Sequence, residues 1–257
     1  MRPFTTRIVL ALGFMSRIPL PSAVFIANPE AKLAESADVF PIIGLIIALP
    51  AALVFFLASL IWPPAISAAL ALIVLAALTG ALHDDGLADC ADAFFGAKKI
   101  ERRLEIMKDS RIGTFGALAL VFVFALGWVC LTHIAESSGT YGAMTALLVA
   151  AAASRAGLVW HWHVLPPARP DGLAASQGKP DWNAVVLAAL YATIIAVPLV
   201  FAFFGFGTII AVLAFAVFGS LLTMILARAK IGGHTGDTLG LCQKIAELSV
   251  LLALASA

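Results

Sequence analysis

Residues 39–83 read VFPIIGLIIALPAALVFFLASLIWPPAISAALALIVLAALTGALH and contain no Asp, Glu, Lys or Arg over 45 positions. Trp62, Pro63 and Pro64 interrupt this uncharged run near its middle. A helix needs about 20 apolar residues to cross a bilayer, so the run is long enough for two crossings. It predicts two membrane-spanning helices, roughly 39–61 and 65–83.

Further uncharged stretches follow along the chain. Residues 112–135 predict a third span, and residues 137–154, extended as far as Trp162, predict a fourth. The stretch 182–227 has double length and is broken at residues 205–207, which predicts a fifth and a sixth. We therefore expect an all-α fold, a polytopic membrane bundle of about six transmembrane helices that forms a single domain over residues 1–257.

The two ends of the chain are less regular. Residues 248–257 are apolar but too short to cross a bilayer, so we expect a short C-terminal helix that packs against the bundle. Residues 8–15 resemble the core of a signal peptide, but Arg17 interrupts the pattern, and Pro19 and Pro21 follow it. We expect this segment to be retained as an interfacial or re-entrant helix.

Composition excludes several classes of protein. Hydrophobic residues make up 62% of the 257 residues and charged residues only 12%, whereas soluble domains have about 45–50% and about 25%. So few charges cannot cover a water-facing surface, which excludes a soluble globular protein, a disordered chain and a nucleic-acid binder. Three scattered cysteines are too few for a disulfide framework or a zinc site.

The basic residues predict the orientation, because Lys and Arg favour the cytoplasmic side of a membrane. With six spans and the N-terminus inside, all sixteen Lys and Arg fall in cytoplasmic segments, and the outer turns carry only Glu136. We expect a multi-pass protein of the cell inner membrane, surrounded by lipid, with its active site facing the cytoplasm.

The main chemical candidate is the acidic motif His83-Asp84-Asp85-Gly86-Leu87-Ala88-Asp89-Cys90-Ala91-Asp92, at the inner end of the second span. On a helix Asp85, Asp89 and Asp92 stand at i, i+4 and i+7 and form one stripe. Carboxylates about 6 Å apart repel by about 3 kcal/mol per pair at an effective dielectric of 20, and Mg²⁺ is a hard cation that relieves such repulsion.

We therefore predict a Mg²⁺ site at Asp85, Asp89 and Asp92, with Asp84 as a further candidate ligand. The alternative is a solvated acidic helix start, which explains Asp84 and Asp85 but not the other two. His83 lies 200° from Asp85 on a helical wheel and is a candidate base rather than a ligand of the stripe.

Two later segments are candidates for binding phosphate. In the stretch 102–116 we expect Lys108, Asp109, Ser110 and Arg111 to line the site, with the two cations on phosphate oxygens; the alternative is an ordinary charged loop. In the stretch 232–240 we expect backbone N–H groups of a glycine-rich loop to face an anion.

The residues concerned in this loop are Gly233, Thr235, Gly236 and Asp237. The aspartate would join the metal site or cap the following helix, and the alternative is a tight turn between helices. Arg155 is either a snorkelling anchor or a phosphate ligand. The alternation of His161 and His163 with tryptophans is typical of an interfacial aromatic belt.

The pattern as a whole resembles the cobalamin synthase family, adenosylcobinamide-GDP ribazoletransferase. The two long motifs match in order and spacing, and one departure is Ala93, where the family commonly has Gly. The remaining matching stretches are 14–19, which adds Arg17 to the candidate substrate-binding residues, 40–44, Ser154-Arg155 and 232–237.

The resemblance implies a Mg²⁺-dependent inner-membrane enzyme that joins adenosylcobinamide-GDP to α-ribazole or its 5′-phosphate and releases GMP. In this reaction Asp85, Asp89 and Asp92 would hold the metal, and Lys108, Arg111 and Arg155 would hold phosphate oxygens. The sequence leaves open whether the enzyme is a homo-oligomer.

Two alternatives remain, one a different enzyme and one a protein of another class. A CDP-alcohol phosphotransferase also carries spaced aspartates, but its motif Asp-Gly-x-x-Ala-Arg is not met here, because Asp89 follows Asp85-Gly86-Leu87-Ala88. A transporter or cation channel would need acids near the middle of the bilayer, and the expected spans contain none.

Overall fold

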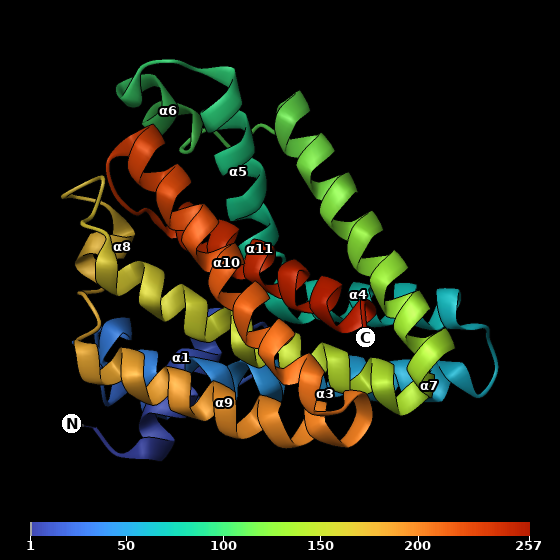
Figure 1. Cartoon of the computed structure of the whole chain (residues 1–257). Helices are drawn as coiled ribbons and strands as arrows, with labels where there is room; N and C mark the ends of the chain where they lie inside the picture. The colour runs from blue at the N-terminus through green and yellow to red at the C-terminus, as the bar shows by residue number, and fades with distance from the viewer. Residues whose placement is uncertain (1) are drawn as a thin grey trace.

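The computed structural model describes residues 2–257, and this part of the chain is built from helices (Figure 1). In chain order the elements are α1 (Phe4–Met15), α2 (Ser22–Ile26), the 3₁₀ helix η1 (Leu33–Val39), α3 (Phe40–Ser59), α4 (Pro64–Thr79), α5 (Leu82–Gly96), α6 (Ile100–Ile106), α7 (Thr114–Val164), α8 (Leu173–Ser176), α9 (Trp182–Phe204), α10 (Phe206–Ile231) and α11 (Gly236–Ala255). The predicted all-α class is confirmed.

The long apolar helices confirm a multi-pass membrane protein. Among residues 2–257, five helical segments are long and apolar enough to cross a bilayer, or six if the bent pair of α4 and α5 is one span. The 51-residue α7 reverses at Gly139, whose φ is 74°, and so covers both the third and the fourth predicted span (Figure 1). Gly205, with φ 83°, separates α9 from α10 where the sequence predicted a break.

The second span ends earlier than expected. It stops at Thr79, and α5 leaves it at 89° because Gly80 and Ala81 both take left-handed conformations, with φ 59° and 56°. The acidic motif therefore lies on a separate helix and not along the end of the second span. Arg17 packs against this bend between α4 and α5, and its backbone N–H donates to the carbonyl of Leu78 at 2.7 Å.

The C-terminal segment corrects a second expectation. Instead of a short helix over the last ten residues, α11 runs for 20 residues, about 30 Å, and is mostly buried. It packs against α7, α10 and α5 (Figure 1). The sequence prediction failed because Lys244 and Glu247 interrupt the apolar pattern, and both side chains are buried inside the bundle.

The N-terminal helix agrees with the predicted interfacial or re-entrant segment. With 12 residues α1 is about 18 Å long, too short to cross a bilayer. Its buried residues Ala11, Leu12 and Met15 join the hydrophobic cluster that contains Phe40 and Trp162.

Helices α5 and α11 approach each other through two glycines. A Cβ at Gly86 would lie 2.7 Å from the carbonyl oxygen of Asp237, and a Cβ at Gly240 would lie 3.1 Å from the carbonyl oxygen of His83. These backbones can meet only without side chains at both positions. The contact brings the acidic motif against the glycine-rich loop.

We expect Gly86→Ala to lower the free energy of unfolding by about 1–3 kcal/mol, because the added methyl group would separate two packed backbones. The matched control is Gly96→Ala in the same helix, where no atom lies within 4 Å of the new methyl group. Thermal unfolding of both variants in detergent checks this. Equal midpoints for the two variants would contradict the close contact.

Candidate functional site

The acidic face of α5 meets a fourth carboxylate from α11. Because α5 turns 89° away from α4 and carries four aspartates, we treat it as lying outside the spanning helices. Burial and then the negative charges of Asp85, Asp237 and Asp92 raise the pKa of Asp89 to about 7. The predicted stripe is therefore a region where negative charge is poorly compensated, and Asp237 belongs to it.

Arg169 is a neighbour of this cluster that the sequence prediction missed. Its positive charge lowers the pKa of Asp89, against the effect of the acids. The preceding loop is held by paired backbone bonds at 2.8 Å, in which His234 N–H donates to Pro166 and Ala168 N–H donates to His234. The only sequence signal for this position is the rigid proline-rich stretch 166–170.

Asp92 has a second role at the start of α7. Its carboxylate accepts hydrogen bonds from the backbone N–H groups of Gly113 at 2.7 Å and Gly116 at 2.9 Å. A Cβ at either glycine would lie 2.4 Å from a carboxylate oxygen. Asp92 therefore caps a helix N-terminus, where negative charge is favourable, and it joins the acidic motif to the stretch 102–116.

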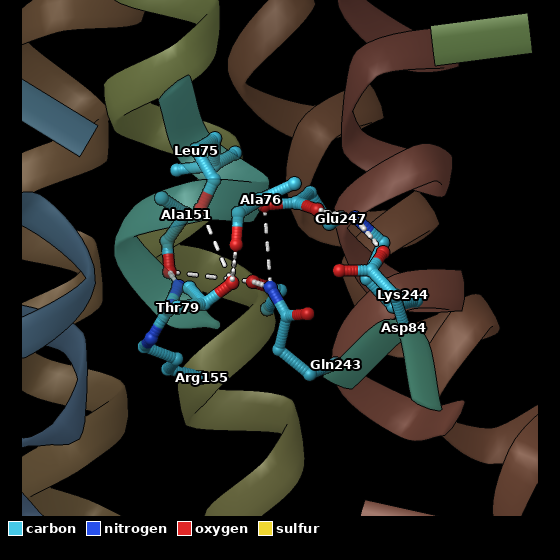
Figure 2. A network of polar contacts seen from close by, with 10 residues as sticks. Leu75, Ala76, Thr79, Asp84, Ala151, Arg155, Gln243, Lys244 and Glu247 are labelled. Atoms are coloured by element: carbon cyan, nitrogen blue, oxygen red, sulfur yellow. Dashed lines mark hydrogen bonds and ion pairs between the residues drawn. The ribbon is translucent and has the colours of Figure 1, made fainter. Parts of the chain in front are cut away.

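The structure does not bring Asp84 together with the other three aspartates. Asp84 is buried in the bundle, where its Oδ1 lies 3.2 Å from Nζ of Lys244 (Figure 2). The same ammonium lies 2.9 Å from Oε2 of Glu247. Asp84 is thus the partner of a buried cation, although the sequence made it a candidate metal ligand.

This ion pair belongs to a larger buried network (Figure 2). Gln243 Nε2 donates to Glu247 Oε1 at 3.2 Å and to the hydroxyl of Ser154 at 3.1 Å. The guanidinium of Arg155 donates to the carbonyl of Ala151 at 2.9 Å. A small cavity of about 20 Å³ lies among these side chains, and His83 also lines it.

The burial of Arg155 and Lys244 contradicts part of the predicted charge distribution. Both are buried inside the bundle, with 1% and 9% of their surface exposed, so Arg155 is not a snorkelling anchor. The expectation that Lys244 and Glu247 lie in a cytoplasmic segment after the sixth span was wrong, because both lie within α11, which is itself long and apolar enough to cross a bilayer. The network is possible because two cations lie beside two carboxylates, Asp84 and Glu247, which balances the charge.

The glycine-rich loop is mainly a capped turn. The N–H of Thr235 donates to the hydroxyl of Thr238 at 2.9 Å, and the N–H of Thr238 donates to the hydroxyl of Thr235 at 3.3 Å. These reciprocal bonds cap α11, so Asp237 is not the cap. A Cβ at Gly233 would lie 2.3 Å from the carbonyl oxygen of Pro166. The structure thus favours the turn alternative, while Gly236 and Asp237 face the acidic cluster and the cavity described next.

A cavity of about 180 Å³ lies beside the acids, and His83, Asp85 and Asp237 form its polar wall. Trp162 also lines it and is buried. His161 is buried as well, so the predicted aromatic belt was wrong for these two residues, whose side chains point into the bundle.

The predicted phosphate-binding residues before α7 form an exposed loop. Arg111 Nη2 lies 2.6 Å from Asp109 Oδ2, and these hydrogen bonds lower the pKa of Asp109 to about 2. Lys108 and Ser110 are exposed. Arg111 stands two residues before Gly113, which is bonded to Asp92, so the loop lies at the border of the acidic face.

The donor chemistry around Asp89 suits a hard divalent cation, because the cluster contains only carboxylate oxygens and too little positive charge. Among residues 2–257, however, no group of three or more His, Cys, Asp or Glu side chains gathers around one point as metal ligands do. Binding of a cation by these residues therefore requires their carboxylates to turn toward one another.

Comparison with known proteins agrees with the motifs. The family model for cobalamin-5-phosphate synthase matches residues 7–255. The chain belongs to this family. An adenosylcobinamide-GDP ribazoletransferase of Rhizobium etli (strain CIAT 652) is 43% identical over 248 residues, which cover 96% of this chain and 95% of the relative. A protein of the same name from Brucella ovis is 44% identical over 254 residues, or 97% and 96% of the two chains. No solved structure matches.

The resemblance predicted from the motifs is thus confirmed, and this member of the family is a transferase of cobalamin biosynthesis. The CDP-alcohol phosphotransferase and the transporter are set aside. Ala93, the departure from the family pattern, is buried within α5 and helical, so its methyl group is accommodated.

We expect Lys244→Met to destabilise the synthase by about 3–5 kcal/mol, because it leaves two buried carboxylates without their shared cation. The control is Arg102→Met, which removes an exposed partner of Glu105 and should cost less than about 1 kcal/mol. Thermal unfolding in detergent compares them. Similar midpoints would show that the buried pair does not stabilise the bundle.

Proposed function

We propose that this synthase is a Mg²⁺-dependent enzyme of the inner membrane that joins adenosylcobinamide-GDP to α-ribazole or α-ribazole 5′-phosphate and releases GMP. The names of the relatives in Rhizobium etli and Brucella ovis support the reaction. The observation that carries the proposal is the close contact of Gly86 with the backbone of Asp237, which places Asp237 beside the acids of α5, and the cavity that Asp85 and Asp237 line together. The negative charges of Asp85 and Asp237 also raise the pKa of Asp89, so a cation would relieve repulsion there.

We assign the metal to Asp85, Asp89 and Asp237, with Asp92 contributing while it caps α7. When bound, Mg²⁺ would neutralise charge on the diphosphate and on the departing GMP. Phosphoryl transfer depends on positioning and electrostatic stabilisation. The role of the protein's own side chains is therefore to bind and orient the reactants.

The cations nearest the acidic face would bind phosphate oxygens. Arg169 is already close to Asp89, and the loop with Lys108 and Arg111 borders the same face. The ion pair between Arg111 and Asp109 is exposed and therefore weak. A phosphate group would take the place of Asp109 as the partner of the Arg111 guanidinium. The ribose hydroxyl that attacks would give its proton to His83 or Asp85, which line one cavity.

We place this site on the cytoplasmic side of the membrane. The loops on the side of the acidic motif carry the exposed Lys and Arg residues, among them Lys98, Lys99 and Lys108, whereas the turn at Gly139 is next to Glu136 alone. This distribution is the one that the positive-inside rule associates with the cytoplasm.

We expect Asp89→Asn to reduce turnover at least about 100-fold, because loss of this charge weakens the hold on a cation, while the protein stays folded and inserted. Asp171→Asn, at an exposed aspartate between α7 and α8, is the control and should keep full activity. GMP release by detergent-purified protein measures both. Near-normal release by Asp89→Asn would remove Asp89 from the mechanism.

We also expect a chelator to abolish GMP release and added Mg²⁺ to restore it, since among the described residues Arg169 is the one cation found to act on Asp89, against three neighbouring acids. Ca²⁺ at the same concentration should restore less, because it prefers more ligands and longer distances than Mg²⁺. Full activity in excess chelator would refute the metal dependence but not the reaction.

A further inference from the structure

The cavity beside the acids has one polar wall, and the rest of its lining is apolar except for Gln177, whose Oε1 accepts a hydrogen bond from the backbone N–H of Leu33 at 3.0 Å. Its deep part is formed by the buried side chains of Met15, Phe40, Leu158 and Trp162, from three different helices. Its rim is formed by exposed apolar residues, with Leu173 on α8 exposed to 68% and Phe14 on α1 to 44%. The cavity therefore opens to the outside between α1 and α8 and ends against a closed apolar floor.

The chemistry of the walls restricts the ligand. Among the described residues no Lys or Arg lines the cavity, so it does not suit a phosphate or a diphosphate, which require cations. The polar wall of His83, Asp85 and Asp237 lies at the border of the acidic cluster. A ligand with an apolar body and a hydroxylated end fits this arrangement, with the hydroxyl groups toward the acids.

The size and the aromatic lining narrow the ligand further. The volume is about 180 Å³, and a buried apolar cavity of about 150 Å³ binds one benzene ring. The rings of Phe40 and Trp162 stack with their centroids 6.4 Å apart and present a rigid aromatic surface. A small planar ring system fits such a space, whereas a corrin macrocycle is too large for it.

We infer that this cavity holds the aromatic base of the ribazole acceptor, with its ribose directed toward Asp85 and Asp237. The inference rests on the proposed function and adds to it a separate subsite for each substrate. The base enters between α1 and α8, and the phosphate groups of the activated cobinamide stay outside, against Arg169 and the loop before α7.

The test fills the cavity without touching the acids. Leu239 on α11 is a partly buried lining residue, and we expect Leu239→Trp to raise KM for α-ribazole roughly tenfold or more, with KM for adenosylcobinamide-GDP within twofold of wild type. The control is Leu213→Trp, the same substitution at an exposed position of α10, which should leave both constants unchanged. Leu239→Phe replaces Leu239→Trp if the larger residue prevents folding.

Binding is measured separately by tryptophan fluorescence, with α-ribazole alone and no second substrate. We expect quenching that saturates in the wild type, disappears in Trp162→Phe and shifts to higher concentration in Leu239→Trp. Quenching without product formation would support the subsite while refuting the proposed reaction. A rise of KM for adenosylcobinamide-GDP only, or unchanged KM for α-ribazole, would overturn the subsite while the reaction stands.

Discussion

The ammonium group of Lys244 holds α5 against α11 from inside the bundle. It lies between Asp84 on one helix and Glu247 on the other, at 3.2 and 2.9 Å. Removal of charged groups from water is costly, so such a cluster persists only when its charges are paired. The close contact of the backbones at Gly86 and Gly240 also holds α5 against α11. This contact between the two helices positions the whole acidic site, because three of its carboxylates are on α5 and the fourth lies in the first turn of α11.

The acidic motif places aspartates on two faces of α5. Asp84 faces the bundle and binds a cation of the protein, whereas its neighbour Asp85 faces the cavity. The same helix ends its stripe at Asp92, which holds the start of α7. Neighbouring aspartates in the sequence therefore serve different purposes: Asp84 stabilises the core, Asp92 orients the next helix, and the others belong to the proposed cation site.

Much of this fold can be predicted from residues, and the exceptions have physical reasons. The uncharged runs indicate α3, α9 and α10, because lipid excludes unpaired charge. The bend after Thr79 was missed because Ala81, unlike Gly80, gives no sign of a left-handed backbone. The length of α11 was missed because Lys244 and Glu247 interrupt its apolar sequence, and charged residues normally mark the end of a span. Here the two charges are paired inside the bundle. Arg169 was missed because only the folded loop brings it to Asp89.

The charges within α11 have a consequence for biogenesis. This helix is synthesised after the others described here, and a lysine and a glutamate facing lipid would resist insertion. Its stable entry therefore requires Asp84 of α5 and Arg155 of α7 to be in place already as partners for these charges. Insertion of α11 therefore completes the contact with α5, and the same event brings Asp237 beside the acids of the proposed site.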